Sequence, residues 1–217
     1  MKIKKLEKLQ DLLDRDISWR KKELIDIKLL IHSTQNKTLC RVGIALLSAH
    51  FEGFIKDAAN YYVVYVASQN LKISDLTTNF AAIQAYSTFD ECANSEKISV
   101  RKRAIEKFLE DYTTKNFQVN YSQEHPIIST QSNPSSTVVK NIFASIGLDF
   151  TPYETKVNYI DSDLLSNRHG VVHGDKVFIE QSDFDSTLKI ITGIMEQFSN
   201  QIMDAACSKA YLSNRQI

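Results

Sequence analysis

The segment 167–176 holds the residues whose types and spacing are best suited to chemistry. Arg168 and His173 lie five positions apart, and His169 follows the arginine directly. Arginine is a permanent cation with a planar fork of donors that suits a phosphate group. Histidine can take up or release a proton near neutral pH. One such cation and one such proton carrier are a minimal set for cleaving an RNA phosphodiester without a metal ion, so this reaction is the first hypothesis.

A purely structural interpretation of the same residues stays open. Basic side chains gather at the C-terminal ends of helices, where they bond to the last carbonyls and offset the helix dipole. Arg168 and His173 stand at the end of a helical stretch and could serve only that purpose. Gly170 and Gly174 favour the functional interpretation, because glycine allows the backbone to approach another group closely. The segment also lies between two strongly apolar stretches, which predicts a polar cluster at a bundle surface or a dimer seam.

A metal site is a weaker interpretation of the segment. His169 and His173 are spaced i,i+4, and Asp175 is a conceivable third ligand. The segment is not an H-E-x-x-H motif, because Gly170 stands in the glutamate position. The sequence also has no P-loop, no G-x-G-x-x-G and no G-x-S-x-G turn. We therefore expect neither a metal ion nor a cofactor, and we expect packing or surface roles for the remaining histidines, His32, His50 and His125.

Glu52 is the acidic residue that we single out as a candidate for the site. It lies four residues before Lys56, and Gly53 interrupts this otherwise good helix at a cost of about 1 kcal/mol. Such a glycine predicts that another helix packs very close at this point. Glu52 is either a half-buried carboxylate paired with Lys56, Arg168 or Arg41, or a residue that orients His173 or holds Arg168 in a catalytic cluster.

The elements that must position these residues are predicted to be helices, since the chain has only 6 glycines and 3 prolines among 217 residues. Apolar residues at three- and four-residue steps predict a long amphipathic helix, or two in series, over 2–32. The stretch 37–69 is apolar over most of its circumference and should be central to the core. Two shorter helices are expected over 78–93 and 98–114, and 116–135 should be a loop.

The C-terminal half shows similar signals. Ser135 or Ser136 should cap a helix that Gly147 ends, and a further helix should span about 154–170. Residues 176–179 are expected to be a short extended piece, followed by a last helix capped by Asp183 or Asp185. The whole chain, 1–217, is therefore predicted to be one all-α domain, a helical bundle with an irregular middle insertion.

The amino-acid composition limits the possible binding partners and the cellular compartment of the protein. Twenty-six basic residues balance 26 acidic ones, so no overall field attracts nucleic acid, and RNA contacts must come from a local patch. Cys40, Cys92 and Cys207 are distant from one another and odd in number, which suits a reducing cytoplasm rather than a disulfide framework. We find no secretory signal and no run of roughly 18 uncharged apolar residues. The expected location is the cytoplasm, without a membrane partner.

The segments discussed above resemble those of a known family. Asn167-Arg168-His169-Gly170-Val171-Val172-His173-Gly174 is similar to the R-x4-H signature of the HEPN superfamily. The segment 49–56, with Glu52-Gly53-Phe54-Ile55-Lys56, resembles the E-G-F/Y-x-K segment of prokaryotic HEPN nucleases of the RiboL-PSP type. Trp19-Arg20-Lys21-Lys22-Glu23-Leu24 is similar to their opening helix. The resemblance runs from about residue 10 to residue 210.

This resemblance implies a HEPN-like bundle of four to five core helices that forms a homodimer, with the active site at or near the interface. It implies a metal-independent endoribonuclease acting as a toxin or phage-defence effector, controlled by an antitoxin or a defence partner protein. The expected products carry a 2′,3′-cyclic phosphate and a 5′-hydroxyl. The implied roles are Arg168 as phosphate clamp, His173 as general base or acid, His169 as its assistant and Glu52 as orienting residue. His169 departs from the asparagine or aspartate that is frequent at its position.

Two other functions stay open. The first is a non-catalytic HEPN-like dimer whose Arg/His loop binds a partner protein or a nucleotide, which would suit the zero net charge. The second comes only from the breadth of the family: nucleotidyl modification of tRNA ends, or a role as antitoxin to a nucleotidyltransferase.

Overall fold

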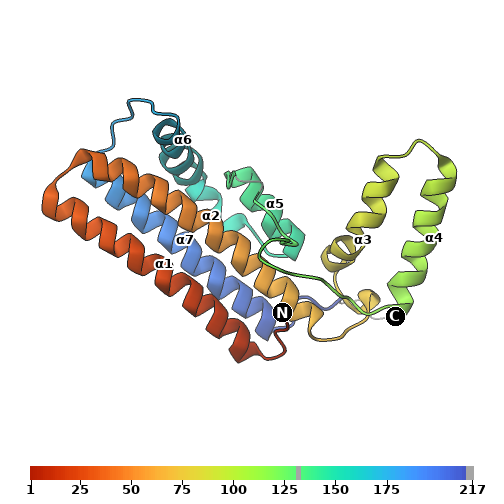
Figure 1. Cartoon of the computed structure of the whole chain (residues 1–217). Coiled ribbons are helices and arrows are strands. Elements are labelled where there is room, and N and C mark those ends of the chain that lie inside the picture. The colour runs from red at the N-terminus through yellow and green to blue at the C-terminus, as the bar shows by residue number, and fades with distance from the viewer. Residues whose placement is uncertain (131–132, 214–217) are drawn as a thin grey trace.

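Every regular element in the described part of the chain is a helix (Figure 1). The computed structural model describes residues 1–130 and 133–213. The α-helices are α1 (Leu6–Thr34), α2 (Lys37–Ala67), α3 (Thr78–Ala93), α4 (Ile98–Thr114), α5 (Ser136–Ile146), α6 (Asn167–Val172) and α7 (Gln181–Cys207). The 3-10 helices are η1 (Ile73–Asp75) and η2 (Thr151–Lys156), and η3 (Tyr159–Ser166) is a π-helix. The predicted all-α class is confirmed.

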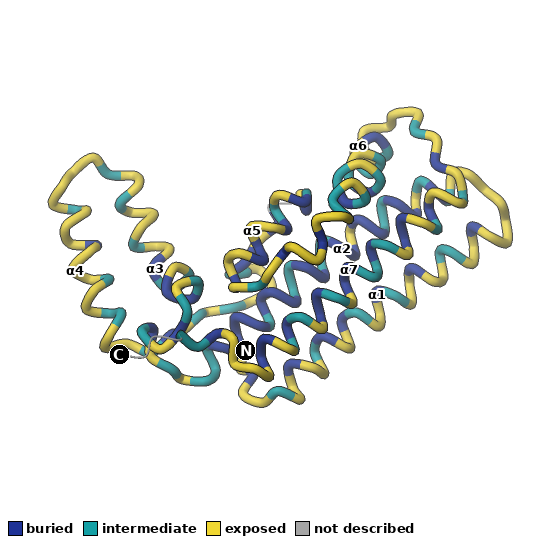
Figure 2. Tube along the Cα trace, turned by 180° about the vertical axis from the view of Figure 1, so that it is seen from behind, coloured by how far each residue is buried: buried dark blue, intermediate teal, exposed yellow. Residues whose placement is uncertain are grey.

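Helix α2 is the centre of the bundle. Its 31 residues extend about 46 Å, and buried side chains occur on every turn from Cys40 to Val66 (Figure 2). Helices α1 and α7 pack along it, while α5, η3 and α6 cross it on the face turned away from α1 (Figure 1). Among the described residues, α2 alone is long and apolar enough to cross a membrane, yet half of that stretch is buried inside the bundle. Its apolar surface is therefore used by the core.

Capping residues set the ends of the long helices. Gln35 adopts a left-handed conformation with φ of 50° and donates its N–H to the carbonyl of Ile31, which ends α1. The Asn36 side chain then accepts the N–H of Thr38 and begins α2. The predicted cap of α7 is wrong: neither Asp183 nor Asp185 is the N-cap. Glu180 holds that position, and Asp183 completes a capping box three residues later.

The irregular insertion consists of a helical hairpin and a loop. Helices α3 and α4 pack on each other through Phe89 and Phe108 and project from the bundle, while the first turn of α3 packs into the core through Phe80 (Figure 1). The base of the hairpin is tied down by backbone hydrogen bonds, from Phe117 to Leu71 and from Thr77 to Tyr211. Because two helices cannot cover each other fully, α4 leaves a row of apolar side chains exposed: Ile98, Ile105 and Leu109.

The loop after α4 is held on α2 by one buried amide. Asn60 is fully buried, and its Oδ1 accepts the N–H groups of Ile127 and Ile128. Its Nδ2 donates to the carbonyls of Ile128 and Lys56. The loop predicted over 116–135 is thus confirmed for the described residues, while positions 131 and 132 lie outside them.

A buried arginine explains the glycine in α2. The guanidinium of Arg20 lies across Gly53, so a Cβ at this position would overlap it. Arg20 donates to Asp16 at 3.1 Å and to Asp57 at 2.9 Å, so the buried cation is paired. The predicted close approach of another helix at Gly53 is confirmed, and the group that approaches is a side chain of α1.

Asn60→Ala should lower the free energy of unfolding by about 2–5 kcal/mol, because it leaves buried peptide groups of the loop without partners. Urea denaturation followed by circular dichroism measures this loss. The exposed residue Asn120, substituted as Asn120→Ala, is the matched control and should change stability by less than about 0.5 kcal/mol. Equal urea midpoints for the two variants would show that Asn60 does not hold the loop on α2.

Acidification should destabilise the protein through His50. Burial lowers the pKa of this imidazole below its ordinary value of 6.5, the Arg20 guanidinium lowers it further, and Glu23 and Asp16 oppose the shift. The unfolded chain therefore binds a proton more readily than the folded protein as the pH falls below 6.5. The free energy of unfolding should decrease between about pH 7.5 and pH 5.5, with a smaller decrease in His50→Gln than in wild type or in the control His125→Gln. Equal slopes in the three proteins would refute this account.

Candidate active site

The R-x4-H residues lie on a short helix that continues from a π-helix. The helical stretch predicted over 154–170 is confirmed, but it is not one α-helix: the chain forms η2, then η3, then α6 without a break. Ile160 and Leu164 are buried and anchor η3 in the core. The Asp161 carboxylate accepts the backbone N–H and the hydroxyl of Ser136, which ties η3 to the start of α5. π-Helical segments are rare and often occur at functional sites.

A tight turn after α6 fixes the position of His173. Gly174 has a φ of 82°, and its N–H bonds to the carbonyl of Val171 at 3.3 Å. The N–H of Asp175 bonds to the carbonyl of Gly170 at 2.8 Å, which completes a Schellman motif. His173 is the C-cap residue of this motif, so its backbone cannot move independently of the turn.

Two contacts attach this turn to the rest of the bundle. The Arg41 guanidinium, from α2, donates to the carbonyl of Asp175 at 2.8 Å. A Cβ at Gly170 would overlap the side chain of Val177, so the returning chain packs directly on α6. The close backbone approach expected at the glycines is thus confirmed at Gly170. The piece over 176–179, expected to be extended, has no regular secondary structure.

The two histidines of the segment form an exposed pair. Both side chains face solvent, and their ring centroids are 4.2 Å apart with an angle of 49° between the planes. The i,i+4 spacing of His169 and His173 on one helical turn produces this contact, and the N–H of His173 bonds to the carbonyl of His169 at 3.0 Å. The pair can therefore exchange protons with solvent or with a ligand.

Arg168 is half-buried and directly precedes His169 on the same short helix. Within residues 1–130 and 133–213, its guanidinium forms no hydrogen bond and no ion pair. Two other arginines of the bundle are engaged, Arg20 by two carboxylates and Arg41 by a carbonyl, whereas the exposed Arg15 of α1 has no partner among the described residues. The guanidinium of Arg168 thus keeps its donors available for an anion, which is the property required of a phosphate clamp.

Glu52 lies on α2 with a different partner from those expected. Its carboxylate accepts the hydroxyl of the buried Thr130 at 2.7 Å. In the described part of the structure, no hydrogen bond or ion pair joins it to Lys56, Arg41 or Arg168. The structure therefore connects Glu52 to the clamped loop.

The structure also contains a pocket that sequence reasoning missed. It has a volume of about 360 Å³ and lies between η3, α6, the returning chain and the first turn of α7. Tyr159, Asp163 and Asn167 follow one another at four-residue steps in the lining, and Phe178 lines the pocket from the segment after the turn. The four-residue spacing of Tyr159, Asp163 and Asn167 could have indicated from the sequence that they share one helix face. Nothing in the sequence indicates that Phe178 lines the same pocket, because only the folded chain brings it there.

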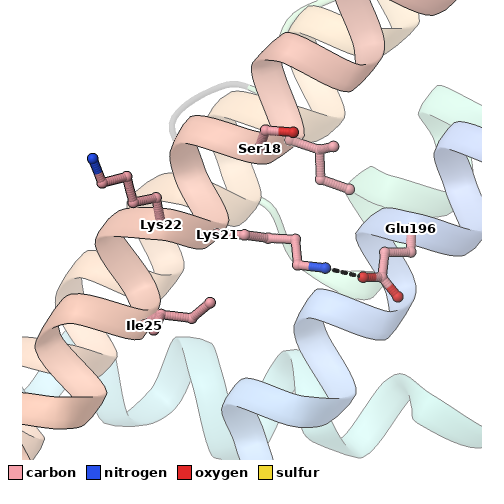
Figure 3. Close-up of a pocket in the computed structure, with 6 residues that line it drawn as sticks. Ser18, Lys21, Lys22, Ile25 and Glu196 are labelled. Carbon is pink, nitrogen blue, oxygen red and sulfur yellow. Dashed lines mark hydrogen bonds and ion pairs between the residues drawn. The ribbon is translucent and has the colours of Figure 1, made fainter.

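Another recess lies between α1 and α7 (Figure 3). It has a volume of about 350 Å³, and an ion pair between Lys21 and Glu196 bridges it. The other lining residues are Ile17, Ser18, Lys22 and Ile25. It shares no residue with the R-x4-H segment and contains no histidine or arginine, so it does not offer the same chemistry.

The described residues do not form a metal site. Among the residues that the structure describes, no group of three or more histidine, cysteine, aspartate or glutamate side chains is placed to hold a metal ion. The His169–His173 pair thus has no third ligand from this set.

Comparison with known proteins identifies the family to which this chain belongs. The family model RiboL-PSP-HEPN matches residues 15–204, a range that includes most of α1, all of α2, the R-x4-H helix and most of α7. None of the curated proteins and none of the solved structures compared with the chain matches it. The match covers far more than half of the chain, and it includes both the Arg20 cluster and the turn after His173. The chain belongs to the RiboL-PSP-HEPN family.

Proposed function

We propose that this protein is a metal-independent HEPN endoribonuclease that acts through Arg168, His169 and His173. The observation that carries the proposal is an unpaired Arg168 guanidinium on the same short helix as two exposed imidazoles that contact each other, with the end of this helix pinned. Half-buried charged groups normally have a partner of opposite charge or a hydrogen-bond acceptor. A guanidinium without one is a suitable ligand for a phosphodiester.

RNA supplies its own nucleophile. In the proposed reaction, the neutral imidazole of His173 accepts the proton of the 2′-hydroxyl, and the 2′-oxygen forms a bond to phosphorus. The bond from phosphorus to the 5′-oxygen breaks, and this oxygen accepts a proton from protonated His169. Arg168 stabilises the negative charge on the phosphoryl oxygens. The products are a 2′,3′-cyclic phosphate and a 5′-hydroxyl, with no oxidation or reduction.

Glu52 has an indirect place in this scheme. Its bond to Thr130 joins α2 to the loop that Asn60 clamps. A role for Glu52 in orienting Arg168 or His173 stays a prediction.

We further infer that residues 1–217 act as one unit, because the C-terminal helix α7 packs on the N-terminal helices α1 and α2. We propose a homodimer with the site at or near the interface, since apolar Val42 and Val172 are exposed around it. Cys40, Cys92 and Cys207 are free thiols, which supports a cytoplasmic location. In this compartment the enzyme would act as a toxin or phage-defence effector, held in check by an antitoxin or defence partner.

A second candidate function is that of a non-catalytic interaction or nucleotide-binding module. The projecting α3–α4 hairpin favours protein binding, because Ile98, Ile105 and Leu109 expose apolar surface along α4. Under this alternative, no purified preparation would cleave RNA at any protein concentration. Substitutions of Arg168 or His173 would also leave partner binding unchanged.

The purified protein should cleave single-stranded RNA in excess EDTA. Arg168→Ala and His173→Ala should each lower the rate by about 10²–10⁴-fold, since each removes a group that acts on the reacting phosphodiester. Cleavage of a labelled RNA measures the rates, and resistance of the 3′ ends to phosphatase identifies the cyclic phosphate.

Two exposed residues of the insertion supply matched controls. Arg101→Ala and His125→Ala remove the same chemical groups far from α6 in sequence and should cleave like wild type. Thermal unfolding of all four variants separates loss of chemistry from loss of fold. Cleavage that stops in EDTA, or that survives in both Arg168→Ala and His173→Ala, would rule out the proposed mechanism.

Gly174→Ala should impair both stability and cleavage. A residue with a side chain at φ of 82° is strained by about 1–2 kcal/mol, although nothing lies within 4 Å of an added Cβ. The strain should displace His173 and lower the cleavage rate by about ten- to a hundredfold. Gly193→Ala, in the interior of α7 with equally open space, should instead stabilise the protein by about 0.5–1 kcal/mol. Equal effects of the two substitutions on unfolding and cleavage would show that the turn does not position His173.

A further inference from the structure

The pocket beside α6 has unused hydrogen-bond acceptors. Asp163 is half-buried, and within the described residues its carboxylate accepts no hydrogen bond and forms no ion pair. Asn167 donates its Nδ2 to the backbone carbonyl of Asp163 at 2.8 Å, which leaves its Oδ1 without a donor in the same set. Asp183, across the pocket, already accepts the N–H of Glu180. The pocket therefore offers one free carboxylate and one free amide oxygen, from residues four positions apart.

The opposite side of the pocket offers an aromatic surface. Phe178 is 74% exposed, so its ring is accessible to a ligand. The ammonium group of Lys176 lies 5.4 Å from the centre of the ring. Tyr159 lines the same pocket from η3. A flat ligand could stack on Phe178 while its edge faces Asp163 and Asn167.

We propose that this pocket binds a guanine base of the RNA, an inference that rests on the proposed nuclease function. Guanine is the base whose Watson–Crick edge presents two adjacent donors, N1–H and the 2-amino group, and a single carboxylate accepts both. The 2-amino group has a second hydrogen that can be donated to Asn167 Oδ1. Adenine and cytosine each present one amino donor next to an unprotonated ring nitrogen, which the carboxylate would repel. Single-stranded RNA is read in this manner, by stacking and by hydrogen bonds to base edges.

The pocket is also well placed for a substrate held by Arg168. Asn167, in its wall, is the immediate chain neighbour of Arg168, so their Cα atoms are about 3.8 Å apart. Side chains of successive helical residues point about 100° apart, so a nucleotide whose base occupies the pocket would extend around α6 to present a phosphate to Arg168. Lys176, beside Phe178, provides a second cation for the backbone of the same nucleotide. The guanine site would thus choose which phosphodiester reaches the histidine pair.

Binding measured without cleavage tests the proposal. In a His173→Ala background, fluorescence anisotropy compares labelled single-stranded pentamers that differ only in a central guanine, inosine, adenine or cytosine. The guanine pentamer should bind about tenfold more tightly than the adenine and cytosine pentamers, and inosine, which lacks the 2-amino group, should be intermediate. Adding Asp163→Asn should abolish the preference, whereas Asp14→Asn, an exposed aspartate on α1, should leave it intact. Phe178→Ala should weaken all four pentamers by about five- to tenfold, because stacking tolerates every base.

Mapping of cut sites by wild-type protein on an RNA of mixed sequence supplies a readout that needs no variant. Guanine should occupy one fixed position relative to the broken bond. Equal binding of the four pentamers, a guanine preference that survives Asp163→Asn, or cut sites without a fixed guanine would each overturn the guanine site. If the wild type cleaves RNA without base preference, the nuclease proposal stands and the guanine site fails. If base-selective binding is found without any cleavage, the guanine site stands and the nuclease proposal fails.

Discussion

The burial of α2 is the constraint on which the rest of this structure depends. A helix of 31 residues that is apolar over most of its circumference must bury much of that surface against other elements. Helices α1 and α7 cover it along its length, and α5, η3 and α6 cover the remaining face. The helix that carries Arg168 and His173 is therefore part of the cover of the core. Its backbone is held by packing, while the outer side chains remain available for chemistry.

Within that cover, the site combines a rigid backbone with unsatisfied side chains. The Schellman turn, the bond from Arg41 and the contact of Gly170 with Val177 all act on the backbone around α6. By contrast, the guanidinium of Arg168 has no acceptor among the described residues, and the imidazoles of His169 and His173 face solvent. A structural role at a helix end would have engaged the arginine with nearby carbonyls, as Arg41 is engaged. Electrostatic catalysis requires hydrogen-bond donors that are already in position where negative charge develops in the transition state.

Much of the fold could be predicted from local signals, and the rest depends on contacts between distant residues. The periodicity of α1 and α2, and the cap at Ser135 with the left-handed Gly147, follow from short-range rules and were confirmed. The π-helix before Arg168 could not be predicted from the sequence, because α- and π-helices have similar amino-acid preferences. They differ in which backbone hydrogen bonds form, and packing against distant residues selects between them. Glu180 is not a preferred N-cap residue, so it was missed. The bond from Glu52 to Thr130 joins residues 78 positions apart, which no local pattern reveals.

The central claim is that one phosphodiester meets Arg168 and the histidine pair at the same time. Nitrogen-15 NMR of the protein, titrated with a 2′-O-methyl dinucleotide that cannot be cleaved, measures this contact atom by atom. The account predicts that the Arg168 Nε resonance and the ring nitrogens of His169 and His173 shift together, with one common dissociation constant. Shifts confined to other residues, or an arginine and histidines that respond with different dissociation constants, would contradict it.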